Sequence, residues 1–299
     1  MQHPEPGKIT IVVTSDNFFS VLLAALIKSV EVNHTSPEFL CFYIIDDGIT
    51  ARNKKLIEQM IDHTKTSITW VPAKQAIPKG IKIPADTSSF PVATYLRLFA
   101  PFIIPQEVEK LIFLDTDMIC TTDIAALWNT SLDGAIFGAV TDRIKTVSNE
   151  WGGISNYKEL GISPDTKYFN SGLLLINPVK WRDEEVTQQV LKALVDNRDY
   201  VRFSDQYGLN VAMHNQWKEL DARWNNFSSA ENNDPYIIHF VETKPIFKDY
   251  NRNKSYQQQF LKYLQLTPWK NQQPIGKYQL LRRRVYYKLK NNLSRYFQK

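Results

Sequence analysis

The chain has 299 residues, of which 43% are hydrophobic, and this composition is that of a globular protein with one large domain or two small ones. Its net charge of +5 is unevenly spread: residues 1–249 carry a net −7, whereas residues 250–299 hold twelve basic and no acidic side chains. Two cysteines, Cys41 and Cys120, lie in apolar runs and form neither a disulfide framework nor a zinc site. Because the sequence begins without a signal-peptide pattern and no apolar run approaches ~18 residues, we expect a cytoplasmic protein.

The first part of the chain alternates between predicted strands and helices. Strands are expected from β-branched and apolar runs at residues 9–13, 39–45, 67–71 and 110–114. Helices are expected from apolar positions at helical spacing at residues 18–33, 50–63 and 93–100, the last after a Pro-rich loop at 72–92. This alternation predicts an α/β fold with a mixed, mostly parallel sheet covered by helices on both faces.

The second part continues the pattern and ends in a basic segment. Strands are expected at residues 135–141 and 172–176, and helices at 178–197 and 204–214. A polar connection at 142–168 is long enough to be typical of a functional loop. Since residues 268–274 resemble a hinge, we expect one α/β domain over residues 1–267 and a helical basic tail over 268–299.

Two carboxylates follow the strand at 110–114 directly, in the motif FLDTD at residues 113–117. Asp115 and Asp117 are two residues apart in an extended segment, so both side chains can point the same way. They would repel each other unless water or a cation lay between them, and Mg²⁺ or Mn²⁺ would suit them. The alternative, that the pair only begins a polar loop, stays open at this point.

Other segments place polar groups near expected strand or helix ends. They are YFNSGLLLIN at residues 168–177, TYLRL at 94–98, DQ at 205–206 with Ser204 as the expected helix N-cap, and IIHF at 237–240 followed by Lys244. With FLDTD, they resemble glycosyltransferase family 8 in order from Ile9 to about Pro245. That family includes bacterial retaining α-galactosyl- and α-glucosyltransferases and glycogenin. The resemblance implies that residues 1–267 form a Rossmann-like, nucleotide-sugar-binding catalytic domain of the GT-A type.

The resemblance implies a metal site and a donor site. Asp115, Asp117 and His239 match the family's metal ligands, usually for Mn²⁺, with Mg²⁺ as the other candidate; a purely structural His239 is the alternative. The remaining donor-site residues implied are Thr14, Ser15, Asp16, Asn17, Phe18, Arg97, Thr116, Asp142, Asn170, Ser171 and Lys244. Among them Phe18 would stack on the uracil, Lys244 would contact the diphosphate, and Arg97 and Asp142 would surround the sugar.

The loop after His239 departs from the family pattern. Residues 239–246 are one residue shorter than that pattern, lack its glycine and end in Ile246 where the pattern has tryptophan. Since glycine lets a backbone approach phosphates closely, the diphosphate contacts of this loop are expected to differ.

The resemblance further implies transfer of a galactose or glucose from a UDP-sugar with retention of configuration. Gln206 would face the sugar, and because an amide is a poor nucleophile, we expect a front-face reaction in which Asp205 and Gln206 stabilise the oxocarbenium-like sugar. A capping role for Asp205 is the structural alternative.

The acceptor is expected to be a glycan or a lipid-linked saccharide of the cell surface. The tail has apolar residues at helical spacing among basic ones, at Tyr278, Leu281, Val285, Leu289, Leu293 and Phe297. This pattern predicts peripheral binding of residues 270–299 to anionic lipid on the inner face of the cell membrane, with an ordinary packed helix as the alternative. A nucleic-acid partner is not expected, since no recognition module is visible.

Three other functions were weighed. A glycogenin-like protein that glucosylates its own tyrosine and a nucleotide-sugar binder without activity both stay open. A phosphoryl or nucleotidyl transferase could use the Asp-x-Asp pair, but it would leave the Asn170 and His239 segments unexplained.

Overall fold

The computed structural model describes residues 7–81, 83, 92–230, 232–282 and 285. Its main sheet has seven strands in the order β3-β2-β1-β4-β7-β6-β8. They are β1 (Lys8–Asp16), β2 (Phe39–Asp47), β3 (Thr66–Pro72), β4 (Leu111–Asp115), β6 (Phe137–Thr146), β7 (Lys167–Ile176) and β8 (Trp217–Glu219). β7 pairs antiparallel with both of its neighbours, and every other pairing in this sheet is parallel. The predicted mixed, mostly parallel sheet is confirmed.

A smaller sheet lies beside the end of β4. It has the order β5-β10-β9, formed by β5 (Met118–Cys120), β9 (Asn226–Phe227) and β10 (Ile237–His239). β10 runs antiparallel to β5 and pairs His239 with Met118. The small sheet therefore brings the C-terminal half of the chain back to the Asp-x-Asp segment.

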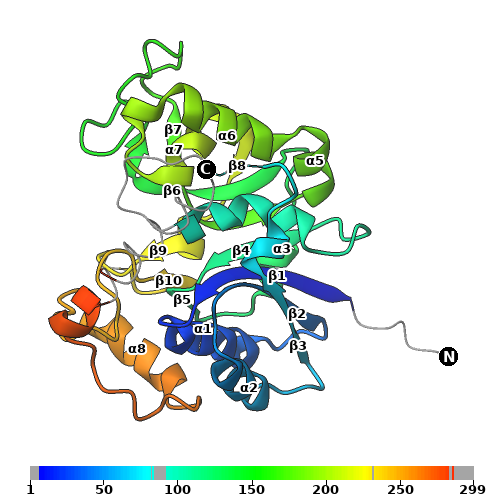
Figure 1. Ribbon diagram of the computed structural model, residues 1–299, viewed down its shortest axis with the longest axis vertical. Coiled ribbons are helices and arrows are strands. Elements are labelled where there is room, and N and C mark those ends of the chain that lie inside the picture. Colours follow the sequence, from blue (N-terminus) through cyan, green and yellow to red (C-terminus); the bar gives the residue numbers. More distant parts are fainter. Residues whose placement is uncertain (1–6, 82, 84–91, 231, 283–284, 286–299) are drawn as a thin grey trace.

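Helices cover both faces of the main sheet (Figure 1). They are α1 (Ser20–Asn33), α2 (Ala51–Met60), α3 (Ala73–Ala76), η1 (Val92–Phe102), α4 (Ala125–Trp128), α5 (Pro178–Asp183), α6 (Val186–Asp196), η2 (Arg198–Tyr200), α7 (Ser204–Ala212), η3 (Ala222–Asn225) and α8 (Lys254–Leu264). Alternate residues of β1 serve the two faces: Val12 packs with the cluster that includes α6 and α7, and Ile11 and Val13 pack with α1. This period-two burial explains why β1 is apolar throughout.

Several predicted boundaries are corrected. The helix expected at 178–197 is broken into α5 and α6, because Glu185 adopts a left-handed φ of 51° between them. The segment expected as a short helix at 93–100 is the 3₁₀ helix η1. β6 continues to Thr146, so the long connection covers residues 147–166 and not 142–168.

The segment after α8 packs against the body as far as residue 280. Ile275 is buried and forms an isolated parallel bridge with Phe247, and Trp269 and Leu280 pack on the same cluster as α1 and α8. The domain boundary at 267/268 stays a prediction. Within the described residues no helix is both long and apolar enough to span a membrane. Leu289, Leu293 and Phe297 of the predicted amphipathic tail lie outside the described residues.

Candidate active site

The site forms where the central strands end. β1 and β4 are parallel, with Thr14 opposite Asp115, so their carboxyl ends share one edge of the sheet. The hydroxyl of Thr116 donates to the carbonyl of Thr14 and joins the two ends. Open α/β sheets bind ligands at this edge, and here the small sheet adds His239 to it.

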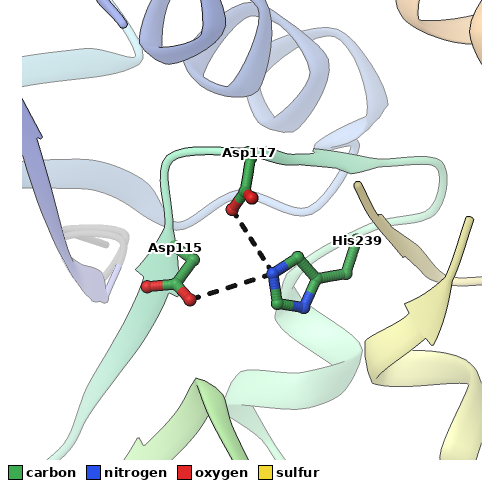
Figure 2. A group of neighbouring side chains, drawn as sticks. All are labelled: Asp115, Asp117 and His239. Atoms are coloured by element: carbon green, nitrogen blue, oxygen red, sulfur yellow. Dashed lines mark ion pairs between the residues drawn. The ribbon is translucent and has the colours of Figure 1, made fainter. Parts of the chain in front are cut away.

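Asp115, Asp117 and His239 converge at one point (Figure 2). Nε2 of His239 lies 3.3 Å from Oδ1 of Asp117 and 3.8 Å from Oδ2 of Asp115. One ligand atom from each residue fits within 4.8 Å of the others. Adjacent ligands of an octahedral ion with bonds of about 2.1 Å lie about 3 Å apart, so small movements would bring these three atoms to a divalent metal. The donor set, two carboxylate oxygens and one imidazole nitrogen, fits such an ion.

The two carboxylates lie in different electrostatic surroundings. Burial alone would raise the pKa of Asp117, but the Lys244 ammonium beside it outweighs this and holds that pKa well below its usual range. Lys244 pairs with Oδ2 of Asp117, which leaves Oδ1 toward His239. Burial raises the pKa of Asp115, and the Arg97 guanidinium offsets this only in part. A cation between the two groups would stabilise both carboxylates.

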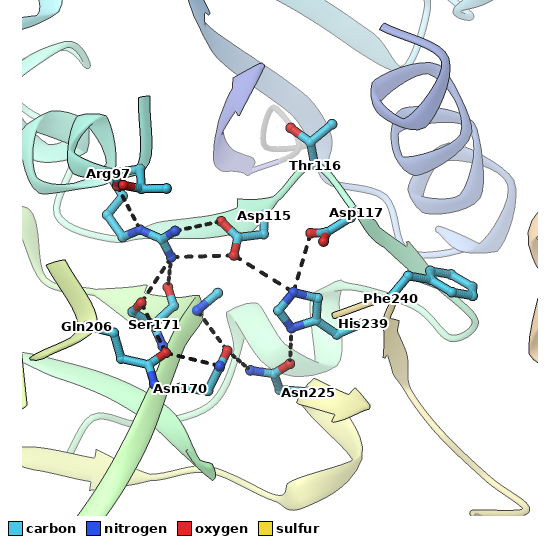
Figure 3. A network of polar contacts seen from close by, with 12 residues as sticks. Arg97, Asp115, Thr116, Asp117, Asn170, Ser171, Gln206, Asn225, His239 and Phe240 are labelled. Atoms are coloured by element: carbon cyan, nitrogen blue, oxygen red, sulfur yellow. Dashed lines mark hydrogen bonds and ion pairs between the residues drawn. The ribbon is translucent and has the colours of Figure 1, made fainter. Parts of the chain in front are cut away.

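Arg97 is a buried link between the metal corner and α7 (Figure 3). Its guanidinium pairs with Asp115 at 3.0 Å and with Asp205 at 2.8 Å, and it donates to the Ser171 carbonyl at 2.5 Å. Burial raises the pKa of Asp205 to about 6 despite the Arg97 charge. Asp205 is 3% exposed, so its carboxylate faces the arginine inside the protein.

A cluster of amides adjoins this arginine. The side-chain oxygen of Gln206 accepts from the Ser171 backbone N–H at 3.1 Å and from Nδ2 of Asn170 at 3.1 Å. Nδ2 of Asn170 also donates to Asp142 at 2.9 Å. Because its oxygen already accepts two donors, Gln206 is held firmly and presents a poor nucleophile. The helix α7 begins at Ser204, one residue earlier than a cap at Ser204 would place it, and Phe203, whose side chain makes no capping hydrogen bond, occupies the N-cap position.

These groups line one cavity of about 500 Å³. Every residue predicted for the site lines it except Asn17 and Phe18. The side chain of Asn17 instead accepts from the Thr50 backbone N–H at 3.0 Å, at the start of α2. Phe18 packs edge-on against Phe19 and against the apolar cluster that includes residues of α1 and α8. Phe19, and not Phe18, therefore lines the cavity.

Several further residues that were not predicted for the site also line the cavity. They are Phe19, Leu22, Thr94, Phe113, Arg143, Ile144, Trp151, Phe203, Ser204, Phe227, Val241 and Glu242. Arg143 and Trp151 lie within residues 142–168, the connection predicted to be functional, and that prediction was the available sequence signal for this wall. The Arg143 guanidinium lies 4.8 Å over the Trp151 ring.

The shortened loop after His239 uses Glu242 in place of the missing glycine. Glu242 has a φ of 64°, in the left-handed region that usually favours glycine. Its carboxylate pairs with Arg143 at 2.5 Å and also with Arg252. Two ion pairs therefore hold a strained residue at the rim of the cavity.

The chain is similar in sequence to several known proteins. General stress protein A of Bacillus subtilis is 25% identical over 283 residues, covering 87% of this chain and 94% of its own length. Glycosyltransferase GlyB of Streptococcus pneumoniae is 27% identical over 255 residues, covering 79% and 57%. Lipopolysaccharide 1,2-glucosyltransferase of Escherichia coli is 27% identical over 200 residues, covering 61% and 56%. The chain thus spans little more than half the length of GlyB and of the lipopolysaccharide glucosyltransferase.

Solved structures confirm the predicted GT-A fold. Galactosyltransferase LgtC, solved in complex with donor and acceptor sugar analogs, has a TM-score of 0.70 and 22% identity, covering 88% of this chain and 100% of its own. The bifunctional glycosyltransferase WbbM has a TM-score of 0.75 and 18% identity, covering 91% and 52%. The family model described as glycosyl transferase family 8 matches residues 10–266. With that match over most of its length, the chain belongs to glycosyltransferase family 8.

Proposed function

We propose that this protein is a metal-dependent, retaining hexosyltransferase that moves galactose or glucose from a UDP-sugar to a glycan or lipid-linked saccharide in cell-surface polysaccharide synthesis. One observation carries the proposal: the Asp115, Asp117 and His239 corner and the Asp205 and Gln206 corner line the same cavity. The first suits a metal-bound diphosphate, and the second is rich in polar groups that suit a sugar. Similarity to a lipopolysaccharide glucosyltransferase and to a galactosyltransferase supports the choice of hexose.

The proposed reaction breaks the bond between the anomeric carbon and the diphosphate and forms a bond from the acceptor oxygen on the same face. A divalent metal, Mn²⁺ by preference or Mg²⁺, would supply Lewis-acid stabilisation of the leaving diphosphate. Lys244, which is half-buried beside Asp117, is placed to add a positive charge there. Losing one such preorganised contact costs about 3 kcal/mol, or about a hundredfold in rate.

Asp205 and Gln206 are proposed to act without forming a covalent bond to the sugar. Asp205 is buried against Arg97, and the Gln206 oxygen is occupied by the Ser171 N–H. Neither arrangement suits the carboxylate nucleophile that retaining glycosidases use. The departing phosphate oxygen would instead accept the acceptor's proton, so that bond breaking, bond formation and proton transfer occur on one face.

Substitution of Gln206 tests this mechanism. Gln206→Ala is expected to lower kcat about a hundredfold, whereas Gln189→Ala, at an exposed position of α6, is expected to leave kcat unchanged. Turnover by Gln206→Ala equal to that of the parent would refute the stabilising role. A glycosyl adduct on Asp205, found by mass spectrometry of the quenched enzyme, would refute the front-face route.

We also propose that the basic C-terminal segment binds anionic lipid on the inner face of the cell membrane. Tyr278, Leu281 and Val285 are exposed by 73%, 57% and 51%, whereas Leu280 packs against the body. An exposed apolar stripe in a segment that lacks acidic side chains matches the surface of an anionic membrane. Replacing Tyr278 and Leu281 together with serine is expected to reduce sedimentation with anionic vesicles; equal sedimentation would refute this role.

A further inference from the structure

Asn225 connects the two corners of the site, although no motif contains it. It ends η3 and directly precedes β9, whose pairing with β10 fixes its position beside His239. Asn225 is 4% exposed, and both ends of its amide are hydrogen-bonded within the site. Its nitrogen donates to Oδ1 of Asn170 at 2.9 Å, and its oxygen lies 2.9 Å from Nδ1 of His239.

The direction of each bond follows from one donor that cannot reverse. The backbone N–H of Gly172 donates to Oδ1 of Asn170 at 2.9 Å, so this atom must be the carbonyl oxygen of the Asn170 side chain. The amide nitrogen of Asn170 then faces the carboxylate of Asp142, which accepts from it at 2.9 Å. This carboxylate acceptor agrees with the orientation that the Gly172 donor requires.

The same reasoning fixes the orientation of the Asn225 amide and then the position of the proton on the His239 ring. Since Oδ1 of Asn170 is an acceptor, the group of Asn225 that faces it must be the NH₂, and the carbonyl of Asn225 must face His239. Nδ1 of His239 must therefore carry a proton. The opposite neutral tautomer would place two lone pairs against each other at 2.9 Å inside the protein.

The proton on Nδ1 determines what the other ring nitrogen, Nε2, can bind. With the proton of the neutral ring on Nδ1, Nε2 presents its lone pair toward Asp117 at 3.3 Å and Asp115 at 3.8 Å. A metal requires this unprotonated nitrogen, whereas a proton there would bond to the carboxylates and exclude the ion. Of the two neutral tautomers, the fixed acceptor at Nδ1 selects the one that directs the Nε2 lone pair toward the carboxylates, where an ion would lie.

We propose that Asn225 is a positioning residue that sets the tautomer of His239 and thereby prepares Nε2 to bind a divalent metal. This inference rests on the metal site of the proposed function. It also means that a chain of hydrogen bonds of fixed direction joins the metal corner, through Asn170, to Asp142 beside Gln206. Figure 3 shows the part of this chain that runs from His239 through Asn225 to Asn170. The residues that would hold the ion and those that would surround the sugar are therefore oriented by one network.

Metal titration of two Asn225 variants tests the proposal. Asn225→Leu removes the acceptor and is expected to weaken Mn²⁺ binding by about ten- to a hundredfold in calorimetry. Asn225→Asp keeps an oxygen opposite Nδ1 but sets its second oxygen against Oδ1 of Asn170, so it should recover only part of that loss. Asn156→Leu is the control: it removes another buried amide, bonded to Asn197 and Tyr207, and should leave the Mn²⁺ affinity unchanged.

A second measurement needs no metal and reads the parent protein directly. In the metal-free full chain, labelled with ¹⁵N-histidine, the neutral His239 ring should show its proton on Nδ1; its signals can be assigned by their loss in His239→Gln. A neutral ring protonated on Nε2 would overturn the proposal even if the protein is an active transferase. Mn²⁺ affinity of Asn225→Leu within threefold of the parent would also overturn it.

Discussion

Gly172 is expected to be essential for the metal corner because its missing side chain makes room for the ligands. A Cβ added at this position would lie 2.5 Å from Cε1 of His239, 2.8 Å from Oδ2 of Asp115 and 2.9 Å from Oδ1 of Asn170. Carbon atoms pack at about 3.5 Å or more, so in Gly172→Ala the imidazole must withdraw by about 1 Å. None of the three crowded side chains is free to move alone, since each is hydrogen-bonded or ion-paired within the site.

The expected loss follows from this displacement. Metal sites tolerate shifts of about 0.2 Å in ligand distance, so a movement of about 1 Å should weaken Mn²⁺ binding about a hundredfold. Overpacking should also lower the free energy of unfolding by about 1–3 kcal/mol. Calorimetric titration with Mn²⁺ and urea denaturation would measure the two effects separately.

Two alanine variants serve as controls for Gly172→Ala. Gly276→Ala places its Cβ no closer than 3.6 Å to any neighbour and should change neither quantity. Gly138→Ala crowds Leu220 at 2.9 Å, outside the cavity, and should reduce stability without changing Mn²⁺ affinity. If Gly172→Ala binds Mn²⁺ within threefold of the parent, then the ligands do not depend on this close approach and the reasoning is refuted.

Three further predictions concern stability and reactivity. Glu242→Gly and Glu242→Ala both lose two half-exposed ion pairs, worth at most about 1 kcal/mol each, but only the glycine variant also relieves about 1 kcal/mol of left-handed backbone strain. Glu242→Gly should therefore unfold at a higher urea concentration than Glu242→Ala, and the reverse order would contradict the strain. Burial alone would raise the pKa of Asp123, but N–H and O–H donors, led by the Ala125 amide, hold it well below its usual range. Its stabilisation is therefore complete above an unfolded pKa of about 3.9 and is lost as pH falls through the lower folded pKa. Asp123→Ala should cost roughly 2 kcal/mol at neutral pH and progressively less in acid, and a cost that does not change with pH would argue against this assignment. Burial raises the pKa of Cys120 to about 12, so a thiol-alkylating reagent at mildly alkaline pH should label the half-buried Cys41 alone in the native protein; equal labelling would contradict the burial.

The position of each metal-corner residue at a strand end could be predicted from local spacing, whereas their joint role as ligands was implied only by the family resemblance. Asp115 and Asp117 end an apolar strand, and His239 ends another β-branched run, so each side chain lies where its strand ends. The family motifs then indicated that the two strands meet. That meeting itself depends on β5 and β10, whose antiparallel pairing carries no short-range signal.

Other parts of the site depend on contacts that sequence spacing does not encode. Phe18 and Phe19 are adjacent, and the turn before α1 decides which ring faces the cavity. From the sequence, Glu242 could be described only as the residue that replaces the family's glycine. In the structure it adopts the glycine-like backbone conformation, and two arginines pair with its carboxylate. Asn225 lies far from Asn170 in sequence, and only the folded chain shows that one amide orients the other.

Metal-dependent release of UDP from UDP-hexoses tests the central claim most directly. The parent protein, incubated with UDP-glucose and UDP-galactose in separate assays, should release UDP from at least one of them in the presence of Mn²⁺. Release should fall to background when EDTA removes the ion and return when Mn²⁺ is restored, because Asp115, Asp117 and His239 would hold the ion that stabilises the diphosphate. Equal release with Mn²⁺ and with EDTA, or no release from either sugar nucleotide, would contradict the account.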